Sequence, residues 1–493
     1  MEFFIEPKIE KRKKADLLAI PFWETEKGAI SAASLGSLEK SLKGPLQSKD
    51  FRGKRGEIFF VYVDEERIAL LGLGKKEKAS VETLRRAYGA LGFASQPKKV
   101  SSIHLVSPHL ESLSLEKSIE GISEGLLLAN YSFLKLKGSE KDKQRFSPIE
   151  KVTFLGNLPK LALEIAKKRA FICEGVNLAR NLVNDNADTI TPPYLADLAR
   201  SFGKKYKQLK VTVFDKKRIE KEKMGLLLAV NRGSNLDPAF IMMEYKGNPK
   251  SKEHTVVVGK GITYDTGGLN LKTGTGMETM KCDMSGAATC FGLVLASVLL
   301  HLPVNFTAVI PTTENSISSS SYKPGDVYIS HNGKTVEIGN TDAEGRLILA
   351  DALSYTVQHL KPTRIIDFAT LTGSIDVALG AEATGMMSNN DALAHSLISA
   401  GESTQERLWR MPLFEEYLEQ LRSDIADLRN VGTRSGGACV AACFLKEFIG
   451  DIPWAHCDIA STAFLTKGKD YLPKYATGVG VRLMVEFFEN YGR

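Results

Sequence analysis

The stretch that most constrains the fold is a short apolar run followed by a loop rich in glycine. Residues 255–258 are all β-branched and uncharged, which is typical of a strand buried on both faces. The next ten residues contain four glycines together with Lys260 and Asp265. Because glycine has no side chain, this composition leaves room for a group that must approach the backbone closely. The pattern predicts a buried strand whose carboxyl end opens onto a functional loop.

A second polar stretch, residues 340–347, places two carboxylates and the guanidinium of Arg346 at the start of a helix. Apolar residues recur at helical spacing over 348–360, so the residues before them form the loop that enters the helix. Asp342 and Glu344 are two positions apart and point the same way if this loop is extended. Two carboxylates aimed at one point repel each other unless a cation or a shared proton lies between them. The alternative is a surface turn with an acidic cap on the helix.

Together the two stretches supply side chains suited to a pair of divalent metal ions. Carboxylate oxygens and one amine nitrogen form such a site without thiolate or imidazole. None of the eight histidines belongs to an H-E-x-x-H motif. Asp283 also lies where it is expected to cap a long apolar helix over 284–300. The set comprises Lys260, Asp265, Asp283, Asp342 and Glu344, with Lys272 and Arg346 beside them.

In order and spacing, these residues resemble the signatures of the leucyl aminopeptidase family, the two-metal cytosolic exopeptidases. The run N-T-D-A-E-G-R-L matches that family's signature throughout. The resemblance implies two divalent ions per subunit, Mn²⁺ or Zn²⁺, bridged by Asp265 and Glu344. Lys260 and Asp283 would complete one metal site, and Asp342 would complete the other. The implied activity is release of leucine and other apolar residues from peptides that have a free N-terminus.

The resemblance also implies roles for residues around the metals. Lys272 would stabilise the developing oxyanion. Arg346 stays protonated and so cannot be the base, and it would instead hold a bicarbonate that relays the proton. The backbone near Leu371 and Gly373 would help to hold this anion. The implied substrate-binding residues are Met280, Thr370, Leu371 and Gly373, and the implied assembly is a homohexamer of two stacked trimers.

Strand and helix patterns alternate along the chain, which predicts an α/β fold with two domains. Residues 1–160 are expected to form a small N-terminal α/β domain, and residues 161–188 a long linking helix. Residues 189–493 are expected to form the catalytic α/β domain around a mainly parallel central sheet. Within it, His456 lies in a strand-like run and is expected to be a hydrogen-bonded core histidine. Strands are predicted at 58–63, 67–72, 102–106, 152–155, 211–214, 255–258, 307–310 and 364–368.

Composition limits the compartment and the rival functions. None of the six cysteines forms a C-x-x-C pair, so we expect buried free thiols in a reducing compartment. We recognise neither a leader peptide nor a run of about 18 apolar residues. We therefore expect a cytoplasmic protein without a membrane span. The net charge of +7 leaves open an additional or primary DNA-binding, regulatory role. A two-metal phosphoesterase is the rival enzyme.

Overall fold

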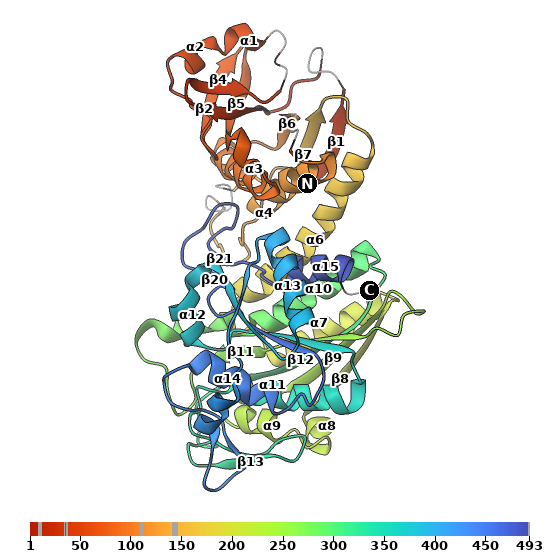
Figure 1. The fold of residues 1–493 in the computed structure, drawn as a ribbon, viewed down its shortest axis with the longest axis vertical. Helices are drawn as coiled ribbons and strands as arrows, with labels where there is room; N and C mark the ends of the chain where they lie inside the picture. The colour runs from red at the N-terminus through yellow and green to blue at the C-terminus, as the bar shows by residue number, and fades with distance from the viewer. Residues whose placement is uncertain (8–11, 34, 36–37, 109–111, 141–145, 492–493) are drawn as a thin grey trace. The chain divides into compact units, whose positions relative to one another are not determined.

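The computed structural model describes residues 1–7, 12–33, 35, 38–108, 112–140 and 146–491. It divides into two compact units, each an α/β structure as the sequence predicts (Figure 1). The division falls inside a long helix, α6 (Leu161–Asn184), which lies within the linking helix predicted at 161–188. The first unit comprises Met1–Cys173 and Thr466–Lys474, and the second comprises Glu174–Leu465 and Tyr475–Arg493.

The first unit is built on a seven-stranded sheet in the order β1-β7-β6-β2-β5-β4, with β3 paired to β2. The two strands predicted at 58–63 and 67–72 form an antiparallel pair, β4 and β5. Ser80 caps the helix that follows, since its side chain accepts a hydrogen bond from the N–H of Thr83. The strands are β1 (Glu2–Glu6), β2 (Leu17–Thr25), β3 (Gly28–Ser31), β4 (Ile58–Val63), β5 (Glu66–Lys75), β6 (Ser102–Val106) and β7 (Lys151–Leu155). The helices are α1 (Leu38–Ser41), α2 (Lys43–Gln47), α3 (Val81–Ser95) and α4 (Leu115–Ala129).

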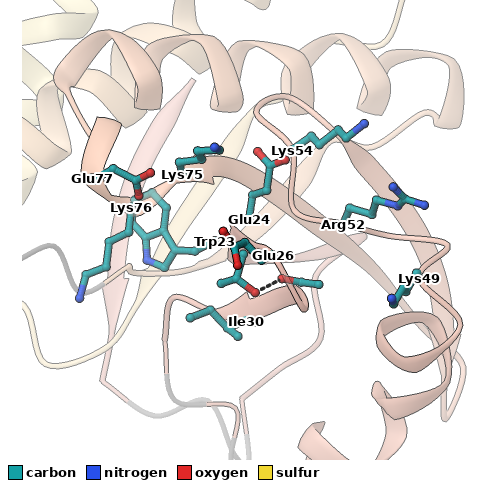
Figure 2. A pocket seen from close by; sticks show the side chains of 12 residues that line it. Trp23, Glu24, Glu26, Ile30, Lys49, Arg52, Lys54, Lys75, Lys76 and Glu77 are labelled. Atoms are coloured by element: carbon teal, nitrogen blue, oxygen red, sulfur yellow. Dashed lines mark hydrogen bonds between the residues drawn. The ribbon is translucent and has the colours of Figure 1, made fainter.

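A cavity of about 660 Å³ lies in the first unit beside the end of β2 (Figure 2). Its lining includes Trp23, five lysine or arginine side chains and three glutamates. Lys54 and Lys75 are among the cations, and Glu24 lies between them in the view. The glutamates offset most of the positive charge, so this cavity lacks the uniform basic lining that a polyanion would require.

The second unit is built on a nine-stranded sheet in the order β17-β16-β19-β15-β10-β12-β9-β8, with β11 paired to β12. Its centre is parallel, because β10 pairs in parallel with β12 and β15, and β15 with β19. Antiparallel pairs join β9 to β12 and to β8, and β16 to β19. The strands are β8 (Leu209–Phe214), β9 (Ala239–Lys246), β10 (Thr255–Gly259), β11 (Gly261–Asp265), β12 (Asn305–Asn315), β15 (Arg364–Ala369), β16 (Thr384–Ser388), β17 (Leu408–Arg410) and β19 (Trp454–Asp458). The mainly parallel central sheet predicted from the sequence is confirmed.

Helices cover both faces of this sheet (Figure 1), which is why all five residues of β10 are buried. On one face lie α7 (Pro192–Lys205), α10 (Ser285–Leu300), α13 (Asp391–Thr404) and α15 (Val481–Asn490). On the other lie α8 (Lys216–Lys221), α9 (Gly225–Asn231), α11 (Gly345–Tyr355) and α14 (Gly437–Lys446). Smaller elements are β13 (Val327–Ile329), β14 (Thr335–Glu337), α12 (Gly373–Leu379), β18 (Leu428–Arg429), β20 (Phe464–Leu465) and β21 (Tyr475–Ala476).

One helical run, Met280–Leu300, is long and apolar enough to cross a membrane. However, 83% of its apolar window is buried inside the protein. Its main part, α10, packs against β10, β12 and β15. The burial therefore identifies this run as a core helix.

The prediction of a loop after β10 is wrong for Gly261–Asp265, because these residues form the strand β11. The cause is the length of β12, which runs to Asn315 while β10 pairs only with its first half. The second half of β12 offers free hydrogen-bonding groups, and the residues after β10 pair with it. As a result Asp265 ends a strand and is held more firmly than a loop residue would be.

Candidate metal centre

The carboxyl ends of the parallel strands meet at one edge of the second sheet, where Lys260 follows β10. Its Nζ lies 2.8 Å from Asp283 Oδ1 and 2.9 Å from Glu344 Oε1. The same Nζ donates a hydrogen bond of 2.7 Å to the carbonyl oxygen of Thr370, which follows β15. Burial alone would lower the pKa of Lys260, but the carboxylates of Asp283, Glu344 and Asp265 raise the pKa well above its usual value. Without a metal, Lys260 is therefore an ammonium at neutral pH.

A second lysine has the same relation to the other two carboxylates. Lys272 Nζ lies 2.8 Å from Asp265 Oδ2 and 2.6 Å from Asp342 Oδ1. Burial would lower the pKa of Lys272, and the charges of Asp265, Glu344 and Asp342 raise it above its usual value. The two lysines thus hold the four carboxylates of the predicted set together in one place.

The cluster carries more negative than positive charge. Four carboxylates face two ammonium groups, which leaves a net charge of −2 when all are ionised. Burial and neighbouring carboxylates raise the pKa of Asp342 to about 6, and burial raises that of Asp283 well above its usual range. An excess of buried negative charge is costly unless cations compensate it. The electrostatics of the cluster therefore favour bound cations.

The geometry of the carboxylates also suits metal ions. Asp265, Asp342 and Glu344 each place one oxygen within 4.8 Å of the others. Asp283 Oδ2 is buried and has no hydrogen-bond partner among the described residues, so one oxygen remains to coordinate a cation. These donors fit divalent ions that accept oxygen and nitrogen ligands. The acidic helix cap considered as an alternative is not formed, since Glu344 makes no side-chain capping hydrogen bond to α11.

The surrounding chain holds these ligands in position. Asp265 Oδ1 accepts hydrogen bonds from Asn315 Nδ2 at 2.8 Å and from the N–H of Gly267 at 2.9 Å. Gly267 has a φ of +87°, which L side chains rarely adopt, and its carbonyl accepts a 2.6 Å hydrogen bond from Thr341 Oγ1. Thr341 directly precedes Asp342, so this hydrogen bond connects the glycine-rich stretch after β10 to the stretch at 340–347.

Arg346 lies in the first turn of α11 and is buried. Its Nη1 donates a 2.9 Å hydrogen bond to the carbonyl oxygen of Asn430, while its Nε has no hydrogen-bond partner among the described residues. Burial lowers the pKa of Arg346 to about 10, so the side chain remains a cation at neutral pH. A buried cation with an unused donor suits a small anion.

The predicted substrate-binding residues lie on two segments next to the cluster. Thr370 Oγ1 donates a 2.7 Å hydrogen bond to Asp283 Oδ1, and Met280 begins the 3₁₀ turn Met280–Met284 that carries Asp283. The N–H of Leu371 donates to Asp458 Oδ1 at 3.0 Å. Gly373, the first residue of α12, is exposed.

Two further predictions have clear outcomes. The prediction that Asp283 caps the helix over 284–300 is wrong, because α10 begins at Ser285 and has Met284 at its cap position. Asp283 lies in the preceding 3₁₀ turn, and its Oδ1 faces Lys260 instead. The prediction that His456 is a core histidine is confirmed. His456 is fully buried, and its Nδ1 lies 2.6 Å from Asp367 Oδ1.

Sequence reasoning missed the polar residues that support the site. Asn315, Thr341, Asn430 and Asp458 are all buried and hydrogen-bonded to the cluster or to the segments that carry it. The sequence could have indicated Asp458, because this residue ends a strand-like run, and ligands of parallel sheets lie at the ends of the strands. Asn430 follows the two-residue strand β18 and has no motif that would identify it.

The fold and the cluster of lysines and carboxylates define a two-unit α/β protein with a candidate metal centre at the edge of a mainly parallel sheet. Comparison with known families identifies it further. Residues 177–485 match the catalytic domain of the cytosol aminopeptidase family, and residues 19–140 match the N-terminal domain of that family. The chain belongs to the cytosol aminopeptidase family, and it is a metal-dependent aminopeptidase.

Individual relatives agree with this assignment. A probable cytosol aminopeptidase of Protochlamydia amoebophila is 57% identical over 99% of both chains, and one of Chlamydia abortus is 46% identical over 99% of both. Among solved structures, a mutant of tomato leucine aminopeptidase is 32% identical with a TM-score of 0.89, covering 99% of this chain and 96% of that one. The bottromycin maturation enzyme BotP in complex with Mn is 28% identical with a TM-score of 0.86, covering 97% and 100%.

Proposed function

We propose that this aminopeptidase uses two metal ions to release leucine and other apolar residues from the N-terminus of peptides, in cytoplasmic peptide turnover. The observation that carries the proposal is that Asp265, Asp342 and Glu344 each place one oxygen within 4.8 Å of the other two. The tomato relative is named a leucine aminopeptidase, which supports the preference for an apolar first residue.

In this proposal the ligands divide between two sites. Asp265 and Glu344 would contribute to both sites, Lys260 and Asp283 would complete one site, and Asp342 would complete the other. Mn²⁺ and Zn²⁺ are the proposed ions, and the BotP structure in complex with Mn supports the former. When held by these residues, a pair of divalent ions would supply the chemistry of two-metal hydrolases, aminopeptidases among them, by making a bound water more acidic and the scissile carbonyl more electrophilic.

The lysines then take different parts. Lys260 must lose its proton to present a neutral nitrogen to the metal, and the divalent charge favours that loss. Lys272 remains an ammonium and moves from its carboxylate partners toward the oxygen on which negative charge develops. Its partial exposure supports this role, because a side chain at the surface of the cluster can reach a substrate.

Arg346 is proposed to hold a bicarbonate next to the metals. Its unused Nε and its cationic state at neutral pH support this assignment. The guanidinium itself does not take part in proton transfer, because its pKa of about 10 keeps the proton in place. Met280, in the same 3₁₀ turn as Asp283, and Thr370, hydrogen-bonded to Asp283, are proposed to shape the pocket for the first side chain, together with Leu371 and Gly373.

The substrate assignment is tested with three compounds on one metal-loaded preparation. Leucine anilide should be hydrolysed, the N-acetylated anilide should not be, and a phosphate monoester should be left intact. The free amine is needed because it is the group that binds a metal. Equal turnover of the free and acetylated compounds would contradict the proposed binding of the amine. Hydrolysis of the phosphate ester alone would favour the phosphoesterase alternative.

A further inference from the structure

A second group of metal-ligating side chains lies in the catalytic unit, apart from the cluster described above. Glu222, His331 and His359 each offer one ligand atom, and these atoms lie within 4.8 Å of one another. Glu222 directly follows α8, His331 lies in the turn between β13 and β14, and His359 lies in the π-helical turn Thr356–Leu360 that continues α11. Three segments that are far apart in the sequence thus bring two imidazoles and one carboxylate together.

The ring of His331 is already oriented for coordination. Its Nδ1 lies 3.1 Å from Ser354 Oγ, and its main-chain N–H donates a 2.8 Å hydrogen bond to Asp351 Oδ1. Because Nδ1 is engaged with Ser354, Nε2 is the nitrogen left to bind a metal. A metal-binding histidine is usually held in place by a hydrogen bond to the ring nitrogen that does not bind the metal. The ring centroid also lies 5.4 Å from that of Tyr355, which limits rotation of the ring.

His359 stands one helical turn after Tyr355, and their ring centroids lie 4.4 Å apart. Its ring centroid is 5.6 Å from that of His331. Zinc ligands at 2.0–2.1 Å in tetrahedral geometry are about 3.4 Å apart. His359 is exposed, so a small rotation of its side chain closes the remaining gap.

Glu222 completes the set as a largely buried carboxylate. Its side chain is 15% exposed, and its Oε1 lies 2.5 Å from Arg218 Nη2 on the preceding helical turn. That contact orients the carboxylate and leaves Oε2 to bind a metal, as carboxylate ligands are often hydrogen-bonded on their other oxygen. Arg218 also places a positive charge nearby, but its side chain is 47% exposed, so solvent screens the repulsion.

The protonation of His331 favours metal binding. Burial and the neighbouring imidazole of His359 lower the pKa of His331 below its usual value, against the opposing effect of Glu222. The ring is therefore neutral at pH 7, which is the form that binds a metal. A neutral imidazole can bind without first releasing a proton.

We propose that Glu222, His331 and His359 form a further metal site that takes Zn²⁺ or a similar imidazole-binding ion, with water completing its coordination. Its ligands differ from those of the lysine and carboxylate cluster, which has no histidine. The site lies at the far end of the helical run whose first turn carries Arg346. Figure 1 shows α8, α9 and β13 close to one another at this end of the catalytic unit. An ion there would tie α8 and the β13–β14 turn to the end of that helical run.

The test compares zinc content in four forms of the full-length protein after equilibrium dialysis against the same micromolar free Zn²⁺. The forms are wild type, His359→Ala, Glu222→Gln and the control His395→Ala. His395 is an exposed helical histidine whose Nδ1 faces the carbonyl oxygen of Asp391 within its own helix. His331 is left unchanged because its ring and its main-chain N–H are both hydrogen-bonded to α11, through Ser354 and Asp351, whereas His359 is exposed. Peptidase activity with Mn²⁺ confirms that each form is folded.

We expect His359→Ala and Glu222→Gln each to bind one zinc ion fewer per chain than wild type, and His395→Ala to match wild type. This outcome is independent of how many ions the catalytic cluster holds, because that cluster is the same in all four forms. Equal zinc content in all four would overturn the proposed site. A similar loss in His395→Ala would also overturn it, since the zinc would then be bound by surface histidines in general.

Discussion

Lys272 Nζ lies 2.6 Å from Asp342 Oδ1, in contact with a carboxylate proposed to bind metal. Lys260 has an equivalent contact with Asp283, yet the two lysines differ in exposure, at 3% for Lys260 and 17% for Lys272. A buried amine surrounded by carboxylates has little room to move, which suits the proposed role of Lys260 as a metal ligand. A partly exposed amine can leave its carboxylates and meet the substrate. This difference in burial is the structural basis for the separate roles proposed here.

The first residue of α11 provides a steric test of the position of Lys260. A Cβ at Gly345 would lie 2.6 Å from Lys260 Nζ and 2.5 Å from its Cε. Gly345→Ala should therefore displace the Lys260 amine, weaken metal binding and lower kcat/KM by a factor on the order of 10², as small misplacements at active sites do. Gly276→Ala is the control, because a Cβ there meets no atom within 4 Å. Metal content and activity are measured for both variants, and a Gly345→Ala enzyme equal to wild type would refute the predicted crowding.

Metal affinity should rise with pH, because Lys260 must lose a proton when its nitrogen coordinates the metal. Its carboxylate neighbours raise its pKa well above the usual value, so the metal-free side chain carries a proton that must leave when the nitrogen coordinates. One released proton makes the binding constant about tenfold larger per pH unit. Below about pH 6 the dependence should steepen, because Asp342, with a pKa of about 6, is then also protonated.

Calorimetric titration of the metal-free protein with Mn²⁺ between pH 5.5 and 8.5, in buffers of different ionisation enthalpy, measures this dependence. Lys260→Ala should lose one released proton, whereas Lys272→Ala should keep it. An affinity that does not change with pH would show that Lys260 is not a ligand.

The assembly state is predicted from the family. We expect a homohexamer of two stacked trimers, as members of the family form. Light scattering at micromolar concentration should give six times the chain mass of 54.0 kDa. A mass of a single chain would contradict the prediction.

The sequence was sufficient to select the lysines and carboxylates that the fold brings together, because in them side-chain chemistry and local pattern coincide. The two signature stretches contain their own functional residues, so the contacts of Lys260 and Asp265 with residues of the other stretch could be expected from parallel-sheet geometry. Central strands such as β10 could be predicted because both faces are buried, which gives a continuous apolar run.

The remaining features depend on contacts between distant segments. Gly261–Asp265 became a strand because β12 is longer than β10, which local composition cannot indicate. Asp283 is not at its predicted cap position because it lies in the 3₁₀ turn before α10, with its Oδ1 facing Lys260. The group of Glu222, His331 and His359 spans more than a hundred positions without a repeated spacing, so only the folded chain brings it together.

The most direct test of the proposed mechanism is metal stoichiometry measured with steady-state kinetics for Lys260→Ala and Lys272→Ala. Lys260→Ala should lose metal and activity together and recover part of both at high metal concentration. Lys272→Ala should keep wild-type metal content and lose kcat by roughly 10²–10³-fold, as expected for a lost oxyanion donor. If Lys272→Ala loses metal while Lys260→Ala retains it, the two roles are reversed and the proposed mechanism is wrong.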